Sequence, residues 1–287
     1  MTEGCVMHSR FATRRSQLAY MTVAVLVAGH VVAGHEFWLT VTSTRLVPGQ
    51  TVPFVIGFGE RLQEPTPGVD LRTIEIQITD QAGKQVRLAT PPQDSQVAVM
   101  KGAIQIPIAP GFYTIAATLR GKAIPYTAAG FQSYLAREQL TSALAFRKAL
   151  SEEAGEAQEI VSLFAKCIVR VGSPPALSWP QLRTRIELQP VSDPTALRVG
   201  DTLHVRLFFN NGPQADAPIT ASGYQGNVAL PAVKGRTNGL GEADMLFPQA
   251  GVWVVRAVQM IPRTAHEGQP SEWESYWASL AVVVANR

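Results

Sequence analysis

His35 is the residue of this sequence whose position could give it metal chemistry. It follows an uncharged apolar stretch, residues 18–33, which is itself preceded by three arginines. This order predicts a secretory signal peptide over residues 1–34, because the apolar run is too short for a transmembrane anchor and nothing after it stops transfer. After cleavage behind Gly34, histidine would be the first residue of the mature chain. Its free α-amine and its ring Nδ1 could then hold one metal ion between them, an arrangement that suits Cu(II) or Ni(II).

The cleavage site and the export route each keep an alternative. Cleavage after Ala33 would leave Gly34 as the first residue and would change the chelate. Arg14 and Arg15 partly resemble a twin-arginine export signal, which carries folded proteins, although Gln17 stands where such signals usually have an apolar residue. Either route predicts a periplasmic or otherwise extracytoplasmic protein with no membrane span in its mature part.

Two further residues are candidates to complete a metal site anchored by His35. His266 lies in a polar loop, residues 262–270, and Glu274 lies near the start of the last apolar segment. Imidazole and carboxylate both bind divalent transition metals, so the sequence predicts one ion of the nickel, cobalt or copper class. The alternative is that His266 is an ordinary loop residue and Glu274 an exposed side chain at a strand end. The third histidine of the mature chain, His204, alternates with apolar neighbours and is expected to point to solvent.

Composition argues against several other functions. Without residues 1–34 the chain loses three of its 25 basic and one of its 22 acidic residues, so its formal charge falls from +3 to about +1, which gives no electrostatic basis for nucleic-acid binding. The sequence contains no nucleophile elbow, phosphate-binding loop, zinc-protease motif or Cys-x-x-Cys. We therefore expect no catalytic residues and no enzymatic activity. Cys167, the one cysteine left after cleavage, lies in a strand-like run and is expected to be a buried, inert thiol.

Apolar residues alternate with polar ones over most of the mature chain. Such period-two runs, separated by Pro, Gly and Asn turns, predict short strands of antiparallel β-sandwiches. The clearest runs are residues 52–58, 74–78, 104–108 and 203–207. Two segments also recur: residues 46–52 match 197–203, and residues 109–115 match 249–255. The same signals in the same order predict two copies of one sandwich.

Between the two copies the pattern changes from period two to a helical period. Residues 131–163 combine helically spaced apolar residues with an acidic end that lacks proline, so they predict two or three short helices. The expected fold class is mainly β, with two tandem immunoglobulin-like or prealbumin-like β-sandwiches and a short helical insert between them. The domains are a signal peptide (1–34), a first sandwich that includes the helical segment (35–172), a proline-containing linker (173–180) and a second sandwich (181–287).

Four segments of the chain carry a resemblance to a known family. They are residues 35–39 (His-Glu-Phe-Trp-Leu), 131–135, 164–166 and 273–280. Together they resemble the bacterial family called domain of unknown function 4198, whose members are often labelled as nickel-uptake related. The resemblance implies an exported, two-domain β protein linked to transition-metal handling. Members commonly place a histidine two residues after an Arg-Ala pair in the second domain. This chain has Gln259 there, after Arg256-Ala257-Val258, which makes Gln259 a weaker candidate ligand.

Two functions of different classes follow from these observations. The first is an exported, non-enzymatic accessory protein that binds a divalent transition metal or helps deliver it to an uptake system. Its partner would be a membrane metal transporter or an outer-membrane receptor. The alternative is an extracytoplasmic scaffold or ligand-binding module that recognises protein or glycan. Trp273, Tyr276 and Trp277 would suit sugar stacking if they were exposed, but their place at the start of the last strand favours packing over the second sandwich.

Overall fold

The described residues from Glu36 onward are built almost entirely from β-strands and belong to one unit, residues 31–287. The structure is a computed structural model, and it describes residues 1, 36–61, 64–65, 73–87, 99–174, 176–226, 228–263 and 271–287. The described strands form three sheets, and two helices follow β8 in the sequence. Neither of these helices, among the described residues, is long and apolar enough to cross a membrane.

The largest sheet has nine strands and is shared by both halves of the chain. Its order is β14-β13-β16-β17-β9-β8-β5-β6, with the short β2 beside β9. Its members from the first half are β2 (Arg45–Leu46), β5 (Glu75–Asp80), β6 (Gln85–Arg87), β8 (Gly111–Tyr126) and β9 (Ala157–Val171). Its members from the second half are β13 (Pro218–Gln225), β14 (Val228–Arg236), β16 (Gly251–Pro262) and β17 (Ser271–Val284). The halves meet where β17 and β9 run parallel, from Ser271 opposite Ala157 to Ala281 opposite Cys167.

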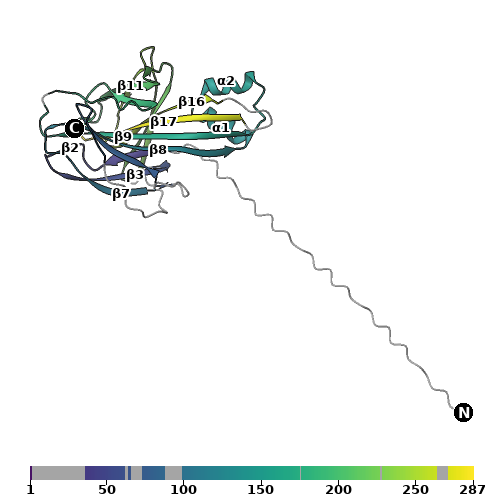
Figure 1. Cartoon of the computed structure of the whole chain (residues 1–287), viewed down its shortest axis with the longest axis horizontal. Helices are drawn as coiled ribbons and strands as arrows, with labels where there is room; N and C mark the ends of the chain where they lie inside the picture. Colours follow the sequence, from purple (N-terminus) through teal and green to yellow (C-terminus); the bar gives the residue numbers. More distant parts are fainter. Residues whose placement is uncertain are drawn as a thin grey trace. The chain divides into compact units, whose positions relative to one another are not determined.

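Two four-stranded sheets cover the large sheet. The first consists of β1 (Glu36–Val41), β3 (Thr51–Arg61), β4 (Glu64–Pro65) and β7 (Val99–Gln105). The second consists of β10 (Ile186–Pro190), β11 (Thr202–Phe209), β12 (Gly212–Pro213) and β15 (Glu242–Leu246). In Figure 1, β8, β9 and β17 run between β11 above and β3 and β7 below. The small sheets therefore cover opposite faces of the large one, and each completes a sandwich.

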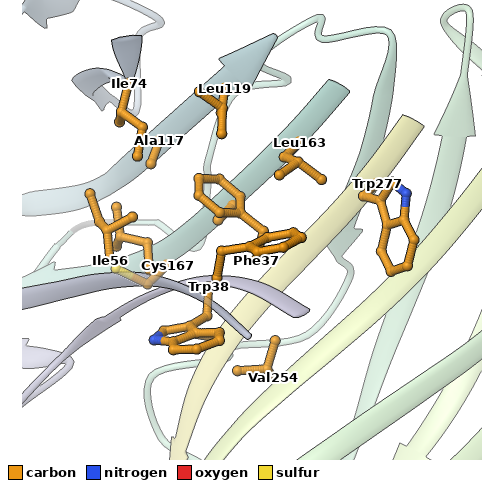
Figure 2. Close-up of a cluster of buried hydrophobic side chains, with 14 of the residues drawn as sticks. Phe37, Trp38, Ile56, Ile74, Ala117, Leu119, Leu163, Cys167, Val254 and Trp277 are labelled. Carbon is orange, nitrogen blue, oxygen red and sulfur yellow. The ribbon is translucent and has the colours of Figure 1, made fainter. Parts of the chain in front are cut away.

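Side-chain alternation along β17 demonstrates the two-faced arrangement. Trp273 and Trp277 belong to the core of the first sandwich, whereas Tyr276 and Leu280 belong to the core of the second. Successive residues of a strand point to opposite faces, so one strand can serve two cores. Figure 2 shows side chains of the first core converging from β1, β3, β8, β9, β16 and β17. Trp273 and Trp277 were expected to pack over the second sandwich, and that expectation is wrong. Only Tyr276 does so.

The predicted repeat is confirmed by matching turns. Gly49 and Gly200 have φ values of +74° and +87°, which favour glycine. In each repeated segment the side chain of the fifth residue accepts a hydrogen bond from the backbone N–H of the second residue. Gln50 accepts from the Val47 N–H at 3.0 Å, and Asp201 accepts from the Arg198 N–H at 2.9 Å. The two late strands match as well. The Tyr113 hydroxyl donates to the Ala109 carbonyl at 2.9 Å, and the Trp253 indole donates to the Gln249 carbonyl at 3.1 Å.

The helical insert is shorter than the sequence predicts. Its helices are α1 (Ala128–Arg137) and α2 (Thr141–Ala149). Thr127 caps α1 by accepting a hydrogen bond from the Gly130 N–H at 3.2 Å. The expected continuation to residue 163 is wrong, because the chain turns at Gly155 and enters β9 at Ala157.

The predicted linker, residues 173–180, lacks regular structure in its described part. Residues 173, 174 and 176–180 contain no helix or strand, and Trp179 packs edge-on against Phe112 with ring centroids 5.6 Å apart. The domain boundaries themselves stay predictions.

Cys167 is buried, as predicted, and burial raises the pKa of its thiol well above the ordinary value. The three sheets confirm a mainly β fold with two β-sandwiches.

Candidate functional site

The structure describes two of the four predicted metal ligands. His35 and His266 lie outside the described residues, so the terminal chelate stays a prediction. Glu274 accepts a hydrogen bond from the Tyr276 hydroxyl and lies 3.3 Å from Nε of Arg263. Gln259 pairs with Tyr276 across the β16–β17 ladder. By strand alternation, Glu274 and Gln259 share the sheet face of Tyr276, which carries the second core.

Glu36, the residue after His35, belongs to a buried polar cluster on the other face of the sheet. Its Oε1 accepts a hydrogen bond from the Ser222 hydroxyl and lies 3.5 Å from Nε of Arg256. Arg256 also donates through Nη1 to Oε2 of Glu138, at 2.6 Å, where α1 ends. We call Glu36, Ser222, Arg256 and Glu138 the Glu36 cluster. It ties β1, β13, β16 and α1 together.

Two carboxylate oxygens of the Glu36 cluster lack a hydrogen-bond partner among the described residues: Oε1 of Glu138, which lies 3.5 Å from Nε of Arg137, and Oε2 of Glu36. Oε2 of Glu36 is buried and, among the described residues, nothing donates to it. A buried carboxylate oxygen without a donor is costly, and in native structures such an atom requires an explanation. A bound cation or a donor from the preceding residue would supply one.

A second buried carboxylate lies farther along the same sheet face. Glu159 on β9 accepts hydrogen bonds from the hydroxyls of Tyr126 and Tyr134, each at 2.8 Å. Ser275 on β17 also hydrogen-bonds to Glu159, and the Trp277 indole donates to the Ser275 hydroxyl at 3.2 Å. These three partners of Glu159 come from β8, α1 and β17, so the carboxyl fixes α1 against the sheet.

Aromatic rings join the two carboxylate sites. Tyr134 stacks on Tyr126, with centroids 5.5 Å apart, and on Trp277, with centroids 6.3 Å apart. The guanidinium of Arg256 lies 5.4 Å from the centroid of Trp277, a cation–π arrangement. The helical insert is thus attached to the sheet by both polar and aromatic contacts.

Burial sets the protonation of this region. Removal from water raises the pKa of Glu36, and the attraction of Arg256 only partly opposes that rise. Burial likewise raises the pKa of Glu159, against the lowering effect of its hydrogen bonds to Ser275 and the two tyrosines. Burial alone would lower the pKa of Arg256, but Glu138 and Glu36 outweigh it, so the pKa rises and the guanidinium stays charged.

The described residues, those of the two carboxylate sites included, form no complete metal-binding group. No group of three or more His, Cys, Asp or Glu side chains in the described ranges could hold an ion. His204 points to solvent, as predicted, with Nδ1 2.6 Å from Oδ1 of Asp244. A complete site would therefore need a donor from the undescribed residues.

The sequence reasoning missed the buried charges although the sequence carries a signal for them. Glu36 and Arg256 stand within apolar strands, and Glu159 is followed by Ile160 and Val161. Charged residues are almost never fully buried unless they are paired. An ionisable side chain inside such a run therefore predicts a buried partner, although it does not reveal which residue the partner is.

The fold and the site define a mainly β protein in which two sandwiches share one sheet and enclose a buried carboxylate–arginine cluster. The chain belongs to the family described as a domain of unknown function (DUF4198), whose model matches residues 32–261. No similar protein was found among the curated proteins.

Some solved structures show a distant similarity to this chain. Escherichia coli α2-macroglobulin is 12% identical, with 88% of this chain and 20% of that chain covered and a TM-score of 0.27. A DUF4785 family protein from Legionella pneumophila is 9% identical, with 76% and 51% covered and a TM-score of 0.27. The E. coli adhesin FdeC is 12% identical, with 88% and 65% covered and a TM-score of 0.26. This chain thus spans less than two thirds of each of these structures, and no function follows from them.

Proposed function

We propose that this protein is an exported, non-enzymatic accessory protein that binds one divalent transition metal and helps deliver it to an uptake system. The observation that supports this proposal is the buried Oε2 of Glu36, which lacks a donor among the described residues. Glu36 directly follows His35, the residue that signal-peptide cleavage would place at the amino terminus.

The ligand set would combine nitrogen and oxygen donors from adjacent residues. The α-amine and imidazole of His35 would supply two nitrogens, and Oε2 of Glu36 would supply an oxygen. Nickel(II) and copper(II) favour such tetragonal N/O sites. Ser222 and Arg256 engage Oε1 of Glu36 and so hold the carboxylate in one orientation, as partners outside the ligand set commonly do.

The remaining candidates have unequal support. His266 keeps its place as a possible further ligand. Glu274 and Gln259 project from the sheet face opposite to Arg256, so a site at Glu36 would not include them. A membrane metal transporter or an outer-membrane receptor would be the partner that takes the ion.

Calorimetry with Ni²⁺ and Cu²⁺ tests the proposal on protein that begins at His35, as verified by intact mass. We expect one site. A single glycine added before His35 moves the amine away from the ring and should weaken binding at least about tenfold, or about 1.4 kcal/mol. Glu36→Gln should weaken it as well. His204→Ala is the matched control, because it removes an exposed histidine that pairs with Asp244. Equal affinity in all four proteins, or no binding in any, would reject metal binding.

The alternative, an extracytoplasmic scaffold that recognises protein or glycan, has one supporting observation. Strand β14 lies at the end of the large sheet, and Val228 is 66% exposed there. Sheet edges can accept a further strand from a partner. The glycan version has lost its main support, because Trp273 and Trp277 are buried in the first core. If the exported chain begins at a residue other than His35, the scaffold becomes the better proposal.

A further inference from the structure

Two arginines lie side by side at one end of the large sheet. Arg45 on β2 and Arg170 on β9 are register partners in a parallel pair, so their side chains leave the sheet on the same face. Together with Leu46, Val47 and Gly172 they line an open hollow of about 290 Å³. This is near the lower limit for ligand pockets and suits a small ion or headgroup.

Backbone carbonyls hold both guanidinium groups through Nε. Nε of Arg45 donates to the Thr195 carbonyl at 3.1 Å, and Nε of Arg170 donates to the Gly172 carbonyl at 3.3 Å. These bonds restrict the orientation of each planar group. Each bond uses only the Nε of a guanidinium group, so the two Nη groups of each arginine remain to bind a ligand.

The arginine pair has no acidic partner in the described part of the chain. No ion pair joins Arg45 or Arg170 to a described carboxylate, and no described acidic side chain lines the hollow. Asp193, in the same loop as Thr195, is engaged elsewhere: its Oδ1 accepts from the Thr195 N–H at 2.8 Å and from the Thr195 hydroxyl at 2.7 Å. Like charges in register destabilise a sheet, so an anion between them would be stabilising.

We propose that Arg45 and Arg170 form a binding site for a phosphate group. A tetrahedral dianion has enough oxygens to accept from both forks, whereas a single carboxylate matches only one fork. Two positive charges also balance a dianion. The phosphate could belong to a free ion or soluble ester, or to a phospholipid headgroup, and the two sources share the same recognition. This proposal is independent of the metal site.

Calorimetric titration with inorganic phosphate, at constant ionic strength maintained with chloride, tests the site on the mature protein. We expect binding that weakens at least about tenfold in the Arg45→Gln/Arg170→Gln double variant, because the variant loses both positive charges and the charge-assisted hydrogen bonds to the anion. Arg206→Gln is the matched control, since it removes an arginine that already pairs with Glu242. Chemical denaturation of each protein verifies the fold. If the double variant does not fold, the single variants Arg45→Lys and Arg170→Lys, which keep the charge but lose the fork, replace it.

Cosedimentation with phosphatidylcholine vesicles, with and without phosphatidic acid, distinguishes a phospholipid headgroup from a soluble phosphate. Binding to phosphatidic acid vesicles that requires both arginines assigns the site to a headgroup. Binding of inorganic phosphate without vesicle binding assigns it to a soluble phosphate. Equal phosphate affinity in wild type and the arginine variants, or no binding to either probe, overturns the proposal.

Discussion

Replacing Arg256 with glutamine should destabilise the protein far more than replacing an exposed arginine. The Arg256 side chain is 14% exposed, and Glu36 and Glu138, its two partners, are each 4% exposed. Removing one partner of a buried ion pair typically costs 3–5 kcal/mol, because an uncompensated charge remains inside. Since Arg256 keeps some contact with water, we expect about 3 kcal/mol. For a chain of this size that corresponds to a fall in Tm of about 6–12 °C.

Urea denaturation at several pH values measures the effect and its cause. Arg256 lowers the pKa of Glu36, so in the variant that pKa should rise further above the ordinary 4.5. A raised folded-state pKa means that stability is greatest at low pH and falls as pH increases. The deficit of Arg256→Gln should therefore be largest near neutral pH and should shrink as pH falls through the raised pKa of Glu36 towards 4.5, because Glu36 takes up a proton in that range.

The control is Arg206→Gln. Arg206 and Glu242 form a surface pair, with side chains 39% and 31% exposed, so its loss should cost below about 1 kcal/mol. A loss below 1 kcal/mol for Arg256→Gln as well, or a deficit that does not change with pH, would refute the electrostatic role assigned to Arg256.

Two further substitutions test the interior. Because burial raises the pKa of Glu159, its contribution to the free energy of unfolding should fall as pH rises above 4.5. Urea denaturation should therefore show a shallower fall of stability with pH in Glu159→Gln than in the wild type. An unchanged pH dependence would contradict this. A Cβ on Gly223 would lie 2.6 Å from the ring of Trp253, so Gly223→Ala should lower the free energy of unfolding by about 1–3 kcal/mol. At Gly239 a Cβ would meet nothing within 4 Å, so Gly239→Ala should stay within about 0.5 kcal/mol, and equal losses at both sites would count against overpacking.

The strands were predictable because their information is local. Alternation of apolar residues places Val52, Phe54 and Ile56 in the core, and each is buried. The repeated turns were predictable for the same reason, since Gly49 and Gly200 need their conformations wherever the chain goes next.

The prediction of helix for the second half of the insert was wrong, because long-range strand pairing determines the structure of that segment. Glu152–Glu159 has good helix formers, but Glu159 is a strand residue whose carboxylate is held by Tyr126 and Tyr134. Helix propensity is a weak prior, and tertiary contacts override it. The buried charges were missed for a related reason: Arg256 and Glu138 are 118 residues apart, and no local pattern joins them.

The parallel pairing of β9 with β17 explains why the second core could not be assigned from the repeat alone. These are the last strands of the two copies, and the sheet order is symmetric about them. Two copies joined by parallel, equivalent strands are related by an axis that lies in the sheet along the strands. Such an axis exchanges the two faces, so each copy must place its small sheet on the opposite side. Any side chain that leaves β17 away from its own small sheet then enters the neighbouring sandwich, as Trp273 and Trp277 do. The same geometry points Arg256 of the second copy towards Glu36 and Glu138 of the first copy, and these contacts form the Glu36 cluster between the copies.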